Sequence, residues 1–258
     1  MTVVTNEVKQ AEYILEHGEV GRKPTHTLFL LGKYYRQKKQ YTKAQTVQRL
    51  HLFMQQHDKT YNSALWENTL EDIAKKATRY PLHEVDSVGI TQSELNRIAS
   101  VKNLKYEKLL FSMLCYAKLY NLISERNNSW VNTDIPELYR TAKVTVKHRE
   151  DKFIYLNDIE QTGLISFSKK NDNLNLRVNF ADMTGIPAVC VSDFRALGYE
   201  YLNYRGEGTF IRCAHCGCLV RKNSRKDFST KYCKECAAIV KGSQKCAWDR
   251  QNRKIRKS

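Results

Sequence analysis

The chain has 258 residues, of which 41% are hydrophobic and 10% aromatic, so it can bury a packed core and is not a disordered protein. Its 43 lysines and arginines exceed its 27 acidic residues by 16, which favours an anionic partner. No apolar run approaches the length of a membrane span, and the first residues lack the basic and apolar regions of a signal peptide. We therefore expect a cytoplasmic protein that does not bind membranes.

Residues 1–103 are predicted to form a helical domain. Pro24 opens one apolar stretch at helical spacing, and Thr42 is placed to cap a second. A further helix is expected over residues 64–78, with Leu65, Trp66, Leu70, Ile73 and Ala74 facing inward. Nothing in this region has a catalytic pattern, and its helices are where we expect a protein partner to bind.

The segment from Ile90 to Leu95 predicts one helix start in detail. Thr91 is followed three residues later by Glu94, the spacing of a capping box, and Ile90 and Leu95 flank them as a hydrophobic staple. A helix should therefore begin directly after Thr91.

Residues 104–181 change from a helical to an alternating pattern. Helices are expected over residues 106–123, from Asp134 and over residues 145–162. Beyond them, apolar residues alternate over 165–167 and 174–180, on either side of a polar turn. The order is three helices followed by a β-hairpin.

This order, with Leu156, Ile159 and the run Gly163-Leu164-Ile165, resembles the winged helix-turn-helix domains. The resemblance covers residues 104–181 and implies a third helix that enters the major groove of DNA and a wing that touches phosphate. The residues that it assigns to nucleic acid are Lys147, Arg149 and Lys152 on the helix, beside Thr145 and His148, and Lys169 and Lys170 at the wing.

More broadly, the order of segments resembles uncharacterised proteins of bacterial phages and integrated elements. That resemblance implies the cytoplasm of a bacterial host but no particular activity.

The third helix also carries four carboxylates, which nearly cancel its positive charge: Glu150, Asp151, Asp158 and Glu160. Acidic side chains on a groove-reading helix would repel phosphate. The alternative is a domain that only packs against a protein or against its own N-terminal half. Residues 182–204 are similarly open, as either a linker or a packed strand and helix.

Two Cys-X-X-Cys pairs, Cys213 with Cys216 and Cys233 with Cys236, lie sixteen residues apart. Four thiolates at this spacing predict one structural Zn²⁺, held by a zinc ribbon or a treble clef, and we predict a ribbon over residues 205–245. Cys218 and His215 are the alternative ligands.

The charge is concentrated around these cysteines. Residues 205–258 hold 15 lysines and arginines against four acidic residues, a net +11 of the whole-chain +16. Such a surface favours nucleic acid, because phosphate contacts release counterions. Residues 246–258 are expected to be a basic tail. The residues predicted to contact nucleic acid here are Arg221, Lys222, Arg225, Lys226, Lys231, Arg250, Arg253, Lys254 and Arg256.

The fold class predicted is α+β and mostly helical, with a helical N-terminal region, a winged-helix middle and a small zinc module with a basic tail. No phosphate loop or catalytic constellation is visible, so we expect no enzyme. The function expected is binding of nucleic acid, with double-stranded DNA favoured, as a transcription regulator or replication accessory of a mobile element. The alternatives are a protein adaptor acting on a host polymerase or replication factor, and an RNA-binding protein.

Overall fold

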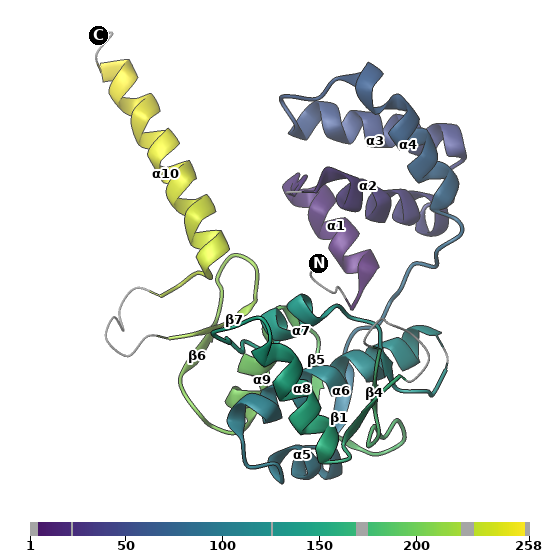
Figure 1. Cartoon of the computed structure of the whole chain (residues 1–258). Coiled ribbons are helices and arrows are strands. Elements are labelled where there is room, and N and C mark those ends of the chain that lie inside the picture. The colour runs from purple at the N-terminus through teal and green to yellow at the C-terminus, as the bar shows by residue number, and fades with distance from the viewer. Residues whose placement is uncertain (1–4, 22, 125, 169–174, 223–229, 256–258) are drawn as a thin grey trace. The chain divides into compact units, whose positions relative to one another are not determined.

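The computed structural model describes residues 5–21, 23–124, 126–168, 175–222 and 230–255 (Figure 1). It is an α+β protein, mostly helical, with three small antiparallel sheets among these residues. The chain divides into two compact units, Val4–Asp86 and a second unit from Ser87 onward. No helix in the described part of the chain is long and apolar enough to cross a bilayer.

The first unit is helical. It consists of α1 (Glu7–His17), α2 (Pro24–Lys33), which continues into a short π-helical turn, η1 (Tyr34–Lys38), then α3 (Lys43–His57) and α4 (Ser63–Lys76). Thr42 caps α3 in a capping box with Gln45, which confirms the predicted start. The core of the unit consists of fully buried side chains from α2, α3 and α4, among them Leu28, Leu31, Leu50, Met54 and Leu70.

The inward position predicted for Leu65 is wrong, because this side chain is 77% exposed. Leu70, Ile73 and Ala74 of the same helix are buried, as predicted. Leu65 lies five residues before Leu70, which places it roughly 140° further around the helix than the buried stripe.

The second unit is built around α6 (Leu104–Ser124). Residues 109–119 are buried without exception, so this helix is covered on all sides. α5 (Gln92–Ala99) packs against it and begins at Thr91 with the predicted capping box. The expected domain boundary at residue 103 falls inside this unit, because β1 (Val88–Thr91) and α5 both contact α6.

A three-stranded sheet lies beside α6. Its strands are β2 (Trp130–Val131), β4 (Leu176–Val178) and β3 (Ile165–Phe167), in the order β2-β4-β3. Ile165 pairs with Val178 and Phe167 with Leu176, so the predicted hairpin is confirmed. The turn between its strands, including Lys169 and Lys170, lies outside the described residues.

Between β2 and β3 the chain forms α7 (Ile135–Thr141) and α8 (Asp151–Gln161). The predicted start of the third helix at residue 145 is wrong by six residues. Lys143 has a left-handed backbone, with φ of 51°, and the β-branched pair Thr145 and Val146 does not favour helix. The α8 start is marked instead by Asp151 Oδ2, which accepts a hydrogen bond from the His148 backbone N–H at 3.2 Å.

Residues 182–204 are a packed strand and helix and not a linker. β5 (Pro187–Val191) pairs antiparallel with β1, and a 3₁₀ turn, η2 (Phe194–Ala196), leads into α9 (Leu197–Tyr204). α9 packs on α6, where the Tyr201 hydroxyl donates to Glu107 Oε2 at 2.8 Å. Gly198 allows the close approach of α9 to α7, because a Cβ there would lie 1.9 Å from the carbonyl oxygen of Ala142.

The described C-terminal elements are a hairpin and a helix. β6 (Phe210–Arg212) pairs antiparallel with β7 (Leu219–Arg221), and α10 (Lys234–Ile255) runs as one continuous helix (Figure 1). Arg250, Arg253 and Lys254 fall on α10. Arg225, Lys226 and Arg256 lie outside the described residues.

Candidate metal centre and basic surface

The first cysteine pair lies in the tight turn that joins β6 to β7. The Gly217 N–H donates to the Cys213 carbonyl oxygen, and the Cys213 N–H donates to the Cys218 carbonyl oxygen, both at 2.9 Å. Gly217 has a φ of 71°, which glycine adopts without the strain of a side chain. A tight turn therefore follows Cys216.

The second pair lies at the start of α10. Cys233 directly precedes the helix and Cys236 lies in its first turn, where the Ala237 N–H donates to the Cys233 carbonyl oxygen at 2.8 Å. The Cys233 N–H donates to Cys213 Sγ at 3.2 Å. A backbone N–H of the second pair thus donates a hydrogen bond to a sulfur of the first pair.

The four sulfurs form a compact group. All lie within 4.8 Å of one another, and Cys216 Sγ is 3.8 Å from Cys233 Sγ. Tetrahedral zinc with Zn–S bonds of about 2.3 Å separates its sulfur ligands by about 3.8 Å. The group can therefore hold a metal ion, and its donor set is compatible with zinc.

The alternative ligands lie outside this group. Cys218 is buried and its thiol lies 3.7 Å from the Leu219 carbonyl oxygen, and burial raises the pKa of Cys218 to about 12. His215 Nδ1 lies 3.6 Å from Cys236 Sγ, so it contacts one sulfur from beside the group. Neither side chain completes the set that the four cysteines form.

The thiols differ in acidity for physical reasons. At Cys213, burial is outweighed by backbone N–H groups that point at the sulfur and lower its pKa to about 6. Burial, together with the neighbouring sulfurs, raises the pKa of Cys236, and burial raises that of Cys233. Several thiolates so close together repel one another, and a divalent cation relieves that repulsion.

The arrangement differs from the predicted zinc ribbon. In the described residues the second pair opens a helix and not a second hairpin. A knuckle in a hairpin followed by a pair at a helix start is the order of the treble clef, the other fold that the spacing allowed.

The cysteine module is fastened to the rest of the second unit through α9 and η2. The Arg195 guanidinium donates to Asp193 Oδ2 at 2.6 Å and to the Cys216 carbonyl oxygen at 2.7 Å. Arg212 pairs with Glu200 at 3.3 Å. The position of the module therefore depends on side chains of α9 and η2.

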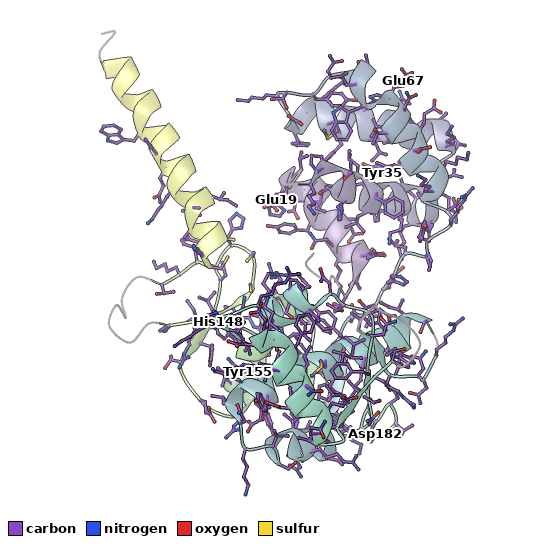
Figure 2. All side chains as sticks on the ribbon, viewed as in Figure 1. Glu19, Tyr35, Glu67, His148, Tyr155 and Asp182 are labelled. Atoms are coloured by element: carbon purple, nitrogen blue, oxygen red, sulfur yellow. The ribbon has the colours of Figure 1, made fainter. Side chains whose placement is uncertain are left out.

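The predicted nucleic-acid contacts that the structure describes lie on two segments of the second unit. Lys147 and Arg149 are exposed in the segment before α8, beside His148 (Figure 2), and Lys152 lies in its first turn with Nζ 5.6 Å from the Tyr139 ring. Arg221 and Lys222 lie at the end of β7, with Lys231 before the second cysteine pair.

Three further lysines, which sequence reasoning missed, connect these segments. Lys108 Nζ donates to the Lys143 carbonyl oxygen at 2.8 Å, and burial together with the charges of Arg221 and Lys105 lowers the pKa of Lys108. Lys105 in turn donates to the Tyr155 hydroxyl of α8 at 3.2 Å. Lys105, Lys108 and Arg221, from α6 and β7, thus lie close to one another, and Lys105 also contacts α8.

We refer to nine cations of the second unit, from the two segments and the three lysines above, as the basic surface. None of them forms an ion pair with a carboxylate in the described part of the chain. Its members are Lys105, Lys108, Lys143, Lys147, Arg149, Lys152, Arg221, Lys222 and Lys231.

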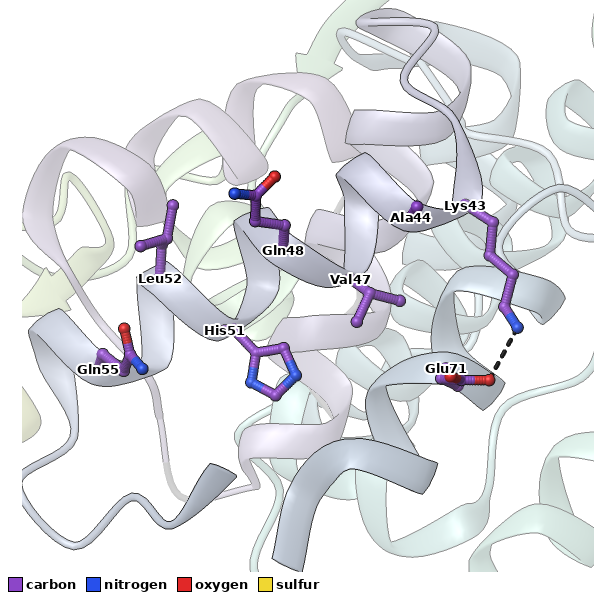
Figure 3. Close-up of a pocket in the computed structure, with 8 residues that line it drawn as sticks. All are labelled: Lys43, Ala44, Val47, Gln48, His51, Leu52, Gln55 and Glu71. Atoms are coloured by element: carbon purple, nitrogen blue, oxygen red, sulfur yellow. Dashed lines mark hydrogen bonds and ion pairs between the residues drawn. The ribbon is translucent and has the colours of Figure 1, made fainter. Parts of the chain in front are cut away.

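The first unit carries a shallow groove along α3 (Figure 3). Ala44, Val47 and Leu52 line it, and an ion pair between Lys43 and Glu71 closes one end at 2.8 Å. The ring of His51 also lines the groove, but its Nδ1 is hydrogen-bonded to the Tyr61 hydroxyl. The lining residues therefore show no arrangement for catalysis.

Comparison with protein-family models, with curated proteins and with solved structures found no match to this chain. Its function must be argued from its own residues.

Proposed function

We propose that the protein binds nucleic acid, preferentially double-stranded DNA, through its second unit. The observation that carries this proposal is the basic surface, in which Lys105 and Lys108 of α6 lie near Arg221 of β7 and none of the nine cations forms an ion pair with a carboxylate among the described residues. Each phosphate that such a cation neutralises releases condensed counterions, which gives affinity without sequence readout. A role as transcription regulator or replication accessory of a mobile element is consistent with this activity.

The element order of the second unit supports a duplex as the partner. α6, β2, α7, α8, β3 and β4 follow one another in the chain, and their sheet has the order β2-β4-β3. This is the order of helices and strands in a winged helix, whose third helix corresponds to α8. Helix-turn-helix proteins place this helix in the major groove.

In this proposal Cys213, Cys216, Cys233 and Cys236 hold one Zn²⁺. A bound Zn²⁺ would neutralise the thiolates and stabilise the short module around them. Four protein ligands fill a tetrahedral shell and leave no open position for a substrate, so the role proposed for the metal is structural and the protein is proposed not to be an enzyme.

The test is a binding experiment with zinc-loaded protein and three probes of equal length: random duplex DNA, single-stranded DNA and RNA. The expected result is tightest binding to the duplex at low salt, with affinity that falls steeply as salt rises. Tighter binding to single-stranded DNA or to RNA than to the duplex would mean that the partner is not double-stranded DNA. No binding to any of the three at low salt would contradict the proposal.

A protein adaptor is the second candidate, and exposed apolar residues of the first unit favour it. Leu52 in the groove of α3 is 40% exposed and Leu65 of α4 is 77% exposed. A Leu52→Ser/Leu65→Ser variant should keep nucleic-acid binding and lose any partner that the first unit recruits. A partner that binds the variant as well as the wild type would exclude these helices as its docking site.

A further inference from the structure

The outward face of α8 carries no exposed cation and one exposed carboxylate, Asp158. Leu156 and Ile159 are fully buried, which fixes the orientation of the helix in the unit. The other exposed side chains of this helix are apolar or carry amides, and they are Phe153, Ile154, Asn157 and Gln161.

Most of the carboxylates of α8 that would repel phosphate accept hydrogen bonds from residues of the same unit. Asp158 Oδ2 accepts from the Tyr106 hydroxyl at 2.5 Å, and Glu160 Oε1 accepts from the Phe167 N–H at 2.9 Å. Asp151 accepts from the His148 N–H at the helix start. These contacts hold three of the four acidic side chains to neighbouring residues of the unit, and the fourth, Glu150, is exposed at the helix start.

The residue types on this face are those that contact A·T base pairs in the major groove. Asn and Gln side chains form bidentate hydrogen bonds with N6 and N7 of adenine, and apolar side chains contact the methyl group of thymine. Guanine is read mainly by Arg or Lys, and the face has neither. The cation of α8, Lys152, lies beside the Tyr139 ring instead.

We propose that α8 reads A·T base pairs in the major groove, with Asn157 and Gln161 on adenine and Phe153 and Ile154 against thymine methyl groups. The inference rests on the proposed binding of duplex DNA and adds its sequence preference. Ile154 and Gln161 are seven residues apart, about 10 Å along the helix axis, which corresponds to about three base pairs. The recognised site is therefore a run of about three or four A·T pairs.

The charges around α8 fit a DNA partner better than an apolar protein surface. Lys147 and Arg149 are exposed immediately before the helix, and Lys105 reaches α8 through the Tyr155 hydroxyl. Cations beside the reading face suit a groove flanked by phosphates, and the carboxylate on that face, Asp158, is hydrogen-bonded to the Tyr106 hydroxyl.

The experiment is selection of binding sites from a random duplex library by the full-length, zinc-loaded chain. The wild type should enrich A·T runs. Asn157→Ala/Gln161→Ala should lower the discrimination between A·T-rich and G·C-rich duplexes by about 10-fold or more. The matched control, Gln55→Ala/Gln56→Ala, removes two exposed amides from α3 of the first unit and should select the same sites as the wild type.

A gain of function separates readout from loss of fold. Asn157→Arg should enrich guanine at one position of the selected site, since Arg pairs with guanine O6 and N7. Salt-dependent binding without base preference, or a preference that none of the α8 variants alters, would overturn this inference and leave duplex binding standing. A Phe153→Ala/Ile154→Ala variant that loses binding to a protein and keeps its base preference would also overturn this inference. Failure of the wild type to bind any duplex would remove the proposed function itself.

Discussion

The paired lysines of the first unit contrast with the basic surface of the second unit. In the first unit Lys9, Lys33, Lys38, Lys43 and Lys76 each pair with a carboxylate of the same unit. In the second unit the cations of the basic surface have no such partner among the described residues. Lysine content alone therefore does not locate a binding surface, because the placement of the carboxylates decides which cations remain available.

The carboxylates of the second unit explain this difference. Glu94 pairs with Lys118 at 2.9 Å and its side chain is 1% exposed, while Glu107, only 3% exposed, pairs with Arg205. Asp193 pairs with Arg195 and holds it against the cysteine module. These three acidic groups are used inside the fold, where breaking a buried pair costs about 3–5 kcal/mol, so they do not pair with the basic surface.

Loss of the metal ligands is expected to have the largest effect. Cys213→Ser/Cys216→Ser should abolish binding of one equivalent of zinc and unfold the hairpin and the α10 start, because metal binding supplies an apparent ~10 kcal/mol or more to such modules. Metal analysis and thermal unfolding measure this. Cys218→Ser is the control and should retain the metal, since its sulfur lies outside the group. Unchanged zinc content in the double variant would exclude this site.

Removal of cations distinguishes position from net charge. Arg221→Ala/Lys222→Ala should reduce the slope of log affinity for duplex DNA against log salt by about 0.9 for each phosphate that the variant no longer neutralises. Lys43→Ala/Lys76→Ala removes the same charge from the first unit, where both lysines pair with carboxylates, and should leave the slope nearly unchanged. Equal effects of the two variants would mean that only net charge matters.

The close approach of α9 to α7 gives a prediction for stability. Gly198→Ala would place a Cβ against the Ala142 carbonyl oxygen, and the shift of α9 should destabilise the second unit by about 1–3 kcal/mol. Gly242→Ala in α10 meets nothing within 4 Å and should be neutral or stabilising by up to about 1 kcal/mol. Denaturant unfolding compares the two, and a wild-type stability for Gly198→Ala would show that α9 does not pack here.

The smallest effect concerns the first unit and pH. Burial lowers the pKa of His83 below its ordinary value of 6.5. The unfolded chain then takes up the proton first as pH falls, so the stability of this unit should be complete above about pH 6.5 and decrease below it. His83→Gln should flatten that decrease in denaturant unfolding between pH 7 and 5. An unchanged slope in the variant would assign the decrease to other groups.

Local signals in the sequence predicted the local structure well. The cap at Thr42 and the capping box at Thr91 are confirmed, as is the hairpin of β3 and β4, because each depends on residues close together in the chain. The Cys-X-X-Cys spacing likewise predicted a four-cysteine group, and the sulfurs converge. The spacing did not distinguish the treble-clef order from a zinc ribbon, because both folds share it.

Features that depend on tertiary contacts were missed. The basic surface includes the hydrogen bond of Lys108 with Lys143, 35 residues apart, which no periodicity indicates. The α8 start depends on how the chain turns at Lys143, and the exposure of Leu65 depends on the absence, among the described residues, of a neighbour over that side of α4. The contacts that hold the carboxylates of α8, such as Tyr106 with Asp158, are also beyond sequence patterns.

The central claim is that nucleic acid contacts the second unit and not the first. Lysine acetylation of the zinc-loaded chain, with and without duplex DNA, tests it at each lysine by mass spectrometry. We expect DNA to reduce acetylation at Lys105, Lys147, Lys222 and Lys231 and to leave it unchanged at Lys38, Lys43 and Lys76. Protection confined to the lysines of the first unit, or equal in the two units, would contradict it.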